Sequence, residues 1–332
     1  MSPGYDWLFF LLPPALSLLL GVLISGTDFA QKPFTLLGYE LTGEDLAIGT
    51  LTHAHLVAVF VRSHGNPTLF PRHPVRFLVV PVVLWGLLTA SAWIATLGCV
   101  VATFWDVWHS GLQTFGLGRI YDRNAGNPPE VGRRLDYWMN HLLYAGPILA
   151  GVTMMDHFSH FEEFASVGAT HLAAVAGFME RTQPLWTRAV LGVGGLYVLV
   201  YVAAYARLHR RGYRVSPLKV FLVASTGLCS IYTWGFNRFG EAFFIMNLFH
   251  AVQYLALVWV SEKGQILGRL RLAGRRHGGA LALALFLGAT LAYGGAAQFV
   301  GDRGALWALT ITVSLMHFWY DGFIWSVRRR EV

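Results

Sequence analysis

Long apolar runs alternate with short polar stretches along the whole chain. Ten runs are long enough for a helix to cross the roughly 30 Å hydrocarbon core of a bilayer. They fall at residues 5–27, 46–63, 75–92, 94–118, 136–154, 185–206, 217–235, 240–261, 279–298 and 304–326. A shorter apolar segment, 164–179, predicts a surface or re-entrant helix. The pattern predicts an all-α, polytopic bundle of about ten transmembrane helices, in which the whole chain, 1–332, forms one membrane domain.

The composition supports a membrane protein. Of the 332 residues, 55% are hydrophobic and 13% are charged, whereas a soluble domain carries roughly a quarter charged residues. A soluble core could not bury so much apolar surface, so most of it is expected to face lipid. The first run, 5–27, has no basic segment before it and no small-residue cleavage site after it, which favours a retained span over a signal peptide.

The basic residues predict which loops face the cytoplasm. The formal charge is +7, but the Lys and Arg residues gather between apolar runs, as in a membrane topology, and do not suggest a nucleic-acid partner. If the C-terminus is cytoplasmic, 20 of the 25 Lys and Arg fall on the inner side, at 62–76, 119–134, 207–219, 263–276 and 328–330. The outer side keeps Lys32, Arg181, Arg188, Arg238 and Arg303. This asymmetry predicts a cytoplasmic C-terminus in a bacterial inner membrane.

Several of the thirteen histidines lie inside predicted spans. An ionisable group is costly at this depth, so each is a candidate for a functional site. Neutral imidazoles on several helices suit iron, zinc or copper. We predict a metal site of His53, His109, His250 and His317, with His55 and His141 as weaker candidates. His53 and His55 point about 200° apart on a helix, so only one of them is expected to face the site, and we favour His53.

Two carboxylates and a tyrosine accompany these histidines. Asp106 precedes His109 by three residues and Asp321 follows His317 by four, so each acid shares a helix face with its histidine. A metal-bound histidine usually donates its second ring N–H to such an acceptor, although the acids could also be ligands or a proton relay. Tyr254 follows His250 by four residues and is expected to line the cavity. Asp106, Asp321 and Tyr254 are the predicted catalytic residues.

The remaining histidines are less informative. Those in basic loops are expected to be solvated: His64, His73, His209 and His277. His157 and His160 form a metal-like pair in the segment Asp-His-Phe-Ser-His-Phe-Glu-Glu, but the topology places it at the outer surface. We therefore do not expect this pair to be the catalytic centre.

Four short segments carry a resemblance to a known family. They are Leu-Thr-His53-Ala-His55, Trp-Asp106-Val-Trp-His109-Ser-Gly111, Leu-Phe-His250-Ala-Val-Gln-Tyr254 and Met-His317-Phe-Trp-Tyr-Asp321. Their order resembles the Brp/Blh family of membrane-bound β-carotene dioxygenases, over about residues 45–326. The resemblance implies one non-haem Fe(II), held by His53, His109, His250 and His317, that cleaves a carotenoid double bond with O₂. Tyr254 stands where that family has a second histidine, so another isoprenoid or an acyl chain is an alternative substrate.

Two other function classes use similar residues. A di-iron desaturase or hydroxylase of acyl or isoprenoid chains normally needs clustered histidine boxes, which this sequence lacks. A bis-His haem protein or a proton-coupled transporter would use intramembrane His and Asp without oxygenase chemistry. The sequence contains no Walker motif, Rossmann fingerprint, nucleophile elbow or zinc-protease motif. We expect an Fe(II)- and O₂-dependent membrane oxygenase that acts on a lipid-soluble substrate.

Overall fold

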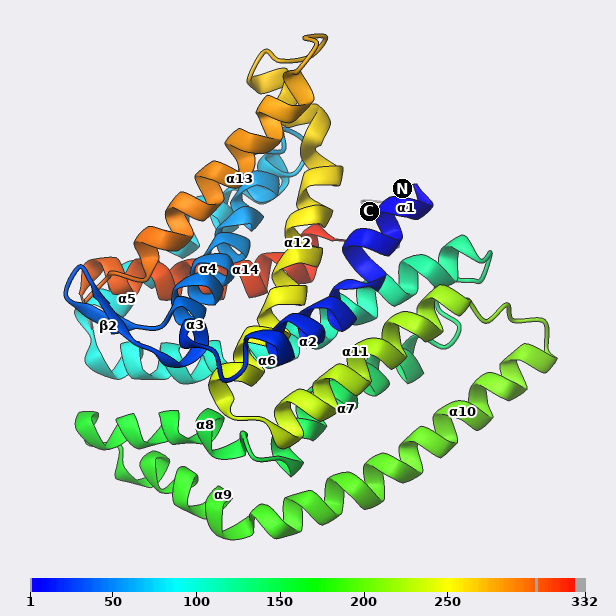
Figure 1. The fold of residues 1–332 in the computed structure, drawn as a ribbon, viewed down its shortest axis with the longest axis horizontal. Helices are drawn as coiled ribbons and strands as arrows, with labels where there is room; N and C mark the ends of the chain where they lie inside the picture. The colour runs from blue at the N-terminus through cyan, green and yellow to red at the C-terminus, as the bar shows by residue number, and fades with distance from the viewer. Residues whose placement is uncertain (1, 302–303, 326–332) are drawn as a thin grey trace. The chain divides into compact units, whose positions relative to one another are not determined.

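The structure is a computed structural model that describes residues 2–301 and 304–325. It is 82% helical, and within the described residues the strands form a single two-stranded hairpin (Figure 1). The chain divides into two compact units. The first contains the described residues up to Gly21 together with Thr103–Met246, and the second contains Val22–Ala102 and the described residues from Asn247 onward. Arg303 and the basic cluster predicted at 328–330 lie outside the described residues.

The first unit is built from helices, most of which follow predicted apolar runs. They are α1 (Pro3–Asp6), α2 (Pro13–Ile24), α6 (Ala92–Asn124), α7 (Arg133–Ala150), α8 (Met154–Phe158), α9 (Thr170–Ala189), α10 (Gly195–Arg210), α11 (Pro217–Phe236) and α12 (Phe239–Arg269). The boundary between the two units falls within α2, α6 and α12. π-helical turns at Trp7–Leu11 and Val190–Gly194 continue α1 and join α9 to α10, and a 3₁₀ helix, Ser159–Val167, precedes α9.

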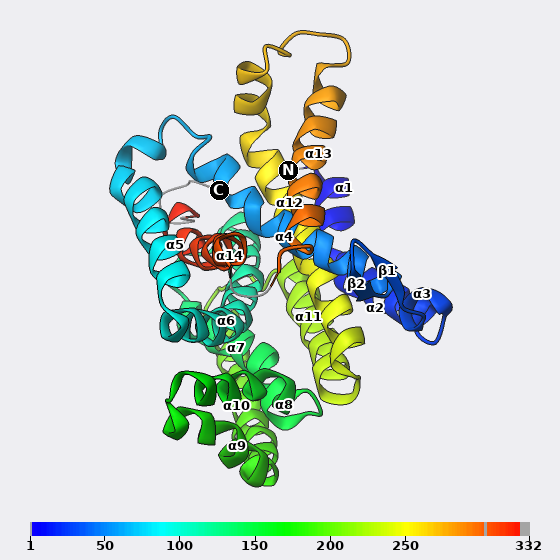
Figure 2. The same ribbon diagram turned by 90° about the vertical axis from the view of Figure 1, so that its left-hand side faces the viewer.

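The second unit adds the hairpin and four longer helices. Its own elements are α3 (Asp28–Gln31), β1 (Phe34–Leu36), β2 (Tyr39–Leu41), α4 (Gly43–Ser63), α5 (Val80–Ala90), α13 (Gly278–Ala297) and α14 (Ala305–Ile324). A 3₁₀ turn at Phe70–Arg72 and a π-helical turn at Val75–Val79 lead into α5. The antiparallel hairpin lies beside α3 (Figure 2) and turns at Leu37 and Gly38, both with positive φ.

Several helices are long and apolar enough to cross a membrane. In the described chain they are Gly43–Ser63, Thr170–Arg210, Phe239–Arg269 and Gly278–Ala297. The number rises from four to six if two bent pairs each form one span: Pro3–Leu11 with Pro13–Ile24, and Val75–Ala90 with Ala92–Asn124. The fold is therefore all-α and compatible with an integral membrane protein, as predicted.

The predicted number of ten spans is not confirmed. α7, α11 and α14 form at the positions predicted for spans 136–154, 217–235 and 304–326, but they are not among the helices that are apolar enough to count. Polar residues within these helices, such as Asp136 and Lys219, lower their mean hydropathy.

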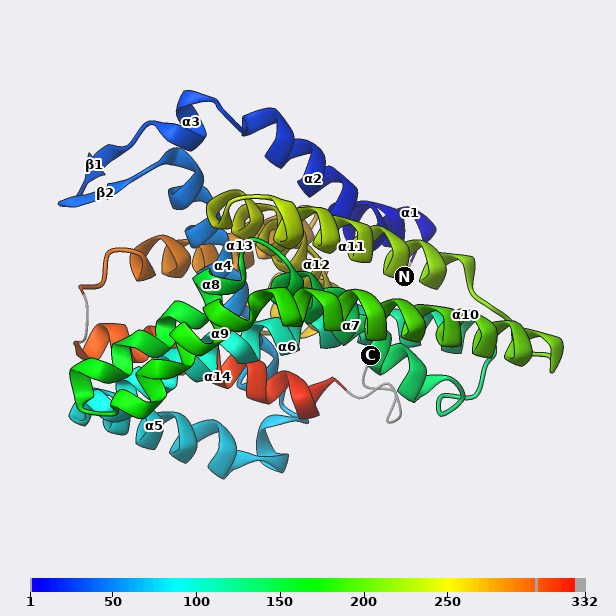
Figure 3. The same cartoon turned by 90° about the horizontal axis from the view of Figure 1, so that it is seen from below.

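The predicted short helix at 164–179 and the predicted span at 185–206 belong to one continuous helical run. Thr170–Arg210 extends over 41 residues through the π-helical turn (Figure 1 and Figure 3). The polar stretch that suggested a loop lies within α9, where Glu180 and Arg181 are exposed and Pro184 is inside the helix. Exposed charged side chains are compatible with a helical backbone, so polarity alone did not mark a break here.

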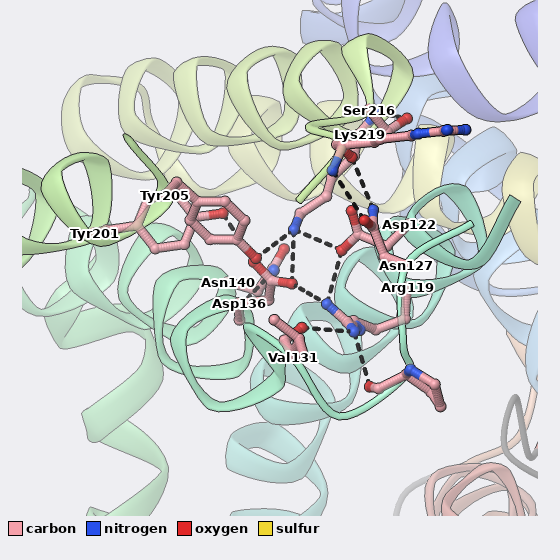
Figure 4. A network of polar contacts seen from close by, with 12 residues as sticks. Arg119, Asp122, Asn127, Val131, Asp136, Asn140, Tyr201, Tyr205, Ser216 and Lys219 are labelled. Carbon is pink, nitrogen blue, oxygen red and sulfur yellow. Dashed lines mark hydrogen bonds and ion pairs between the residues drawn. The ribbon is translucent and has the colours of Figure 1, made fainter. Parts of the chain in front are cut away.

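A buried charge cluster joins four helices of the first unit (Figure 4). It consists of Arg119 on α6, Asp122 on α6, Asp136 on α7 and Lys219 on α11. Each of the two cations lies 2.7 Å from a carboxylate oxygen of each acid. Tyr205 on α10 donates its hydroxyl to Asp136 at 2.6 Å, so α10 joins the cluster. Two cations and two anions balance each other, which offsets the desolvation cost of burying them.

The loops next to this cluster are tied together as well. Arg119 donates to the carbonyl oxygens of Pro129 and Val131, at 2.8 and 3.0 Å. Asn127 donates to the carbonyl oxygen of Arg214 and accepts from its N–H, at 2.8 and 3.0 Å. The α6–α7 and α10–α11 loops therefore meet at one end of the first unit.

Tyr213, in the α10–α11 loop, lies buried against the same cluster. Burial and the Asp122 carboxylate raise the pKa of Tyr213 above its usual range. The phenol therefore remains protonated at neutral pH, and no further negative charge is added to the balanced cluster.

In the second unit, α13 lies alongside α4 (Figure 1 and Figure 2). The two backbones approach so closely at Gly294 that a Cβ there would collide with the carbonyl oxygen of Thr50. Gln298, just beyond α13, donates to the carbonyl oxygen of Leu46 and to the Thr50 hydroxyl, at 3.0 and 2.6 Å. α13 therefore holds α4 in place at Leu46 and Thr50, in the part of the helix that precedes His55.

Replacing Lys219 by Met should lower the free energy of unfolding by about 3–5 kcal/mol, because it leaves two buried carboxylates facing a single cation. The measurement is denaturant-induced unfolding of the detergent-solubilised protein. Lys32→Met is the matched control, since Lys32 pairs with Asp28 at 3.8 Å on the surface and its loss should change little. Equal effects of the two substitutions would contradict a structural role for the charge cluster.

Candidate metal centre

Three buried histidines from three helices meet within the second unit. His55 lies on α4, His250 on α12 and His317 on α14. One ring nitrogen of each lies within 4.8 Å of those of the other two. The His55 ring stands edge-on to both of the others, with centroid distances of 5.0 Å. We call these residues the histidine triad.

The triad has the donor set and spacing of a metal site. Neutral imidazole nitrogens bind Fe, Zn and Cu at about 2.0–2.1 Å, so two ligands of one ion lie at most about 4.2 Å apart. Nitrogens that lie within 4.8 Å of one another are at most about 0.6 Å beyond that spacing. The residues present therefore fit a single transition-metal ion.

A buried ion pair holds the helices that carry the triad. Arg62 on α4 contacts Glu262 on α12 at 2.5 Å. Its Nε and Nη2 donate to the carbonyl oxygen of Ile324 on α14, at 3.3 and 3.1 Å. Asn66 donates to both Glu262 oxygens, at 3.3 and 3.2 Å. The three helices are therefore joined at one end by hydrogen bonds to the same guanidinium group.

A hydrogen-bonded carboxylate lies between this ion pair and the triad. Asp321 Oδ1 accepts from the Tyr254 hydroxyl at 2.8 Å and from Trp325 Nε1 at 2.9 Å. The Arg62 guanidinium lies 3.9 Å above the Trp325 ring. The Tyr254 ring is 4.5 Å from the His317 ring and 5.9 Å from that of His55. Tyr254 and Asp321 thus lie beside the triad, close to where the sequence predicted them.

The tautomer of His317 follows from its contacts. Nδ1 lies 3.1 Å from the carbonyl oxygen of Leu56, which can only accept, so Nδ1 carries the proton. In the neutral ring Nε2 then holds a lone pair. The sequence suggested that Asp321 accepts the second ring N–H of His317. The structure instead gives that role to Leu56, and Asp321 Oδ2 lies 3.7 Å from Nε2.

The preference for His53 over His55 is not supported. His53 is half-buried and its Nδ1 lies 2.9 Å from the carbonyl oxygen of Gly49, on its own helix. His55 occupies the position in the triad. The sequence contained a signal for His55. Arg62 follows it by seven residues, about two helical turns, so the two polar side chains lie on one face of the helix.

The other predicted residues lie in the first unit. His109 is buried and Asp106 is half-buried on α6. His141, on α7, is buried and stacks on Trp108 at a centroid distance of 3.8 Å. Their roles as ligands or supporting groups stay predictions.

His157 and His160 have different environments. His157 is buried between the rings of Trp234 and Phe239, and its Nδ1 lies 2.8 Å from the Thr153 carbonyl oxygen. Burial lowers the pKa of His157, which favours a neutral, structural imidazole. His160 is part-exposed and lies 3.6 Å from Glu163. The environment of His157 is that of a core residue.

Comparisons of the chain with models of protein families, with curated proteins and with solved structures find no match. The interpretation of the site therefore depends on its own geometry.

Replacing His55 by Ala should abolish stoichiometric metal binding, whereas His53→Ala should leave it within about twofold of the unmodified protein. The two positions are on the same helix, but only His55 belongs to the triad. The measurement is the metal-to-protein ratio after detergent purification and dialysis. Loss of metal from His53→Ala alone would show that the wrong member of the pair has been assigned.

Proposed function

We propose that the chain is a membrane-embedded non-haem iron oxygenase that acts on an apolar, lipid-soluble substrate. The observation that carries the proposal is the convergence of His55, His250 and His317 from three helices. A carotenoid or other long isoprenoid is the favoured substrate class, and oxidative cleavage of a double bond by O₂ is the favoured reaction.

The choice of iron follows from the ligands and the surroundings. Three imidazoles leave coordination positions of a transition metal open for other groups. Aromatic rings lie against the triad: the rings of Tyr254 and Phe318 are 4.5 and 5.7 Å from the His317 ring, and both residues are buried. An apolar molecule offers no bond that a redox-inert Zn²⁺ would hydrolyse, whereas Fe(II) supplies redox chemistry with O₂.

The protein groups around the triad have distinct tasks in this proposal. The Leu56 carbonyl fixes the tautomer of His317, so that Nε2 is the nitrogen available for a metal. The Tyr254 hydroxyl donates a hydrogen bond to Asp321, and the Tyr254 ring packs against the rings of His317 and His55. The Arg62–Glu262 pair keeps the three helices in place while the substrate enters from the lipid.

We also propose that the C-terminus faces the cytoplasm of a bacterial inner membrane. Support comes from Arg62, Glu262 and Ile324, which meet at one end of the second unit although they belong to three different chain segments. The alternation of basic clusters assigns these same segments to the inner side.

Purified protein should contain about one iron per chain and show no Soret band, and it should consume O₂ when a carotenoid is added. The His250→Ala variant should lose the iron and the O₂ uptake, because one of three ligands is missing. The double variant His157→Ala/His160→Ala should keep both. The measurements are metal analysis, an absorption spectrum and an oxygen electrode.

Other results would replace this proposal with a specific alternative. About two irons per chain would indicate a di-iron desaturase or hydroxylase. A Soret band would indicate haem, and a metal-free protein would indicate proton-coupled transport.

A green fluorescent protein fused to the C-terminus should fluoresce, whereas alkaline phosphatase at the same position should be inactive. Both outcomes are expected of a cytoplasmic C-terminus, because the first reporter folds there and the second needs the oxidising periplasm. An active phosphatase fusion would reverse the proposed orientation.

A further inference from the structure

The hairpin of β1 and β2 has one apolar face and one polar face. Directly paired residues of an antiparallel ladder point to the same side of the strands, and successive pairs alternate between the two sides. Two pairs, both apolar, share one side: Phe34 with Leu41 and Leu36 with Tyr39. The pair between them, Thr35 with Glu40, points to the other side. A two-stranded hairpin has no second layer of its own, so its apolar face needs a partner from outside the hairpin.

The rest of the described chain covers this apolar face only in part. Phe34, Leu36 and Tyr39 are 42, 36 and 37% exposed. The Tyr39 ring stands edge-on to the ring of Phe299, with a centroid distance of 5.8 Å. More than a third of each of these three side chains is therefore left for contact with something other than the described residues.

The tip of the hairpin carries a further apolar side chain. Leu37 and Gly38 form the turn, with φ of 53° and 86°. A turn with positive φ at both central residues favours Asn-Gly, because a leucine has no polar group that stabilises the left-handed conformation. The Leu37 side chain is also 74% exposed. In water this residue would be unfavourable both for its backbone and for its exposed apolar surface, whereas in an apolar environment only the first cost remains.

The hairpin lies where two apolar helices end. β2 leads through Thr42 into α4 (Figure 1), and the Thr42 hydroxyl caps that helix by accepting from the Asp45 N–H at 3.1 Å. α13 ends at Ala297, two residues before Phe299, which contacts Tyr39. Both helices are long and apolar enough to cross a membrane. A chain that leaves a span enters the boundary between acyl chains and headgroups, so the hairpin belongs at that level.

We propose that the hairpin is an anchor in the membrane interface and that its partner is the lipid bilayer. Its apolar face and the Leu37 side chain insert between lipids beside the start of α4, while Thr35 and Glu40 face water. Tyr39 suits this boundary, because its ring is apolar and its hydroxyl is polar. Since β2 leads into α4, the anchor fixes the depth at which the helix that carries His55 enters the membrane.

The test places a nitroxide at Leu37→Cys or at Glu40→Cys, in protein reconstituted into liposomes. Cys99 and Cys229 are replaced by Ala in both variants, so that each contains one thiol. O₂ collides with nitroxides mainly inside the bilayer, and a charged nickel chelate collides with them mainly in water. We expect the ratio of O₂ to nickel accessibility to be several-fold higher at position 37 than at position 40, which is the matched control on the polar face of the same hairpin.

A second measurement uses the unmodified protein, so it does not depend on whether a variant folds. An apolar carbene precursor dissolved in the bilayer is activated by light, and the labelled positions are identified by mass spectrometry. We expect label at Leu36 and Leu37 and none at Glu40. Leu199 on α10 is the positive control, because it is an apolar side chain with 68% exposure on a helix that is apolar enough to span.

Two results would contradict the anchor. Equal nickel accessibility at positions 37 and 40, with carbene label at Leu199 but not at the hairpin, would place the whole hairpin in water. Protection of position 37 from both reagents, with dipolar broadening between nitroxides, would show that a second copy of the chain covers the face in place of lipid. The inference is separate from the proposed function, because metal content and O₂ uptake do not enter either measurement.

Discussion

The geometry of the second unit depends on the buried ion pair between Arg62 and Glu262. Taking both groups out of water costs several kcal/mol each, and the attraction between them offsets this only if the remaining hydrogen-bonding positions are filled. Asn66, the Ile324 carbonyl oxygen and the Trp325 ring fill them. Because these partners come from the segments that carry the histidine triad, satisfying one guanidinium group also fixes the relative positions of α4, α12 and α14.

The chemistry of the site follows from this arrangement. On α4 and α14, the triad residues His55 and His317 lie seven residues before Arg62 and Ile324, about two helical turns away. Trp325 connects the ion pair to Asp321, and Asp321 connects it to Tyr254 and the His317 ring. The polar groups of this unit thus form a continuous path from the end of the helices to the triad. A side chain in such a path has few alternative positions, which suits a metal site that must keep its ligands in place.

Most of the fold could be predicted from the sequence, because helices form wherever a predicted apolar run occurs. The errors concern properties that hydropathy does not report. Glu180 and Arg181 suggested a loop, although they lie on the exposed surface of a continuous helix. Lys219 was grouped with a basic loop, although it is buried against two carboxylates. Whether a charge is solvated or paired depends on partners far away in the chain, and a local pattern does not contain that information.

The site was predicted in its residue types but not in all its members. His250, His317, Tyr254 and Asp321 come together within the second unit, whereas the choice between His53 and His55 required the direction of each side chain. Trp325 was missed because it lies just beyond α14 and has a role only through its contact with Asp321.

The charge cluster of the first unit and the histidine triad of the second differ in the groups that they bury. In the charge cluster of the first unit, both cations lie at hydrogen-bonding distance from both acids, so the opposite charges balance. At the triad, three imidazole rings converge, and one ring nitrogen of each lies within 4.8 Å of those of the other two. Imidazole nitrogens at this spacing suit a metal ion, whereas a balanced set of charges suits a scaffold that joins helices.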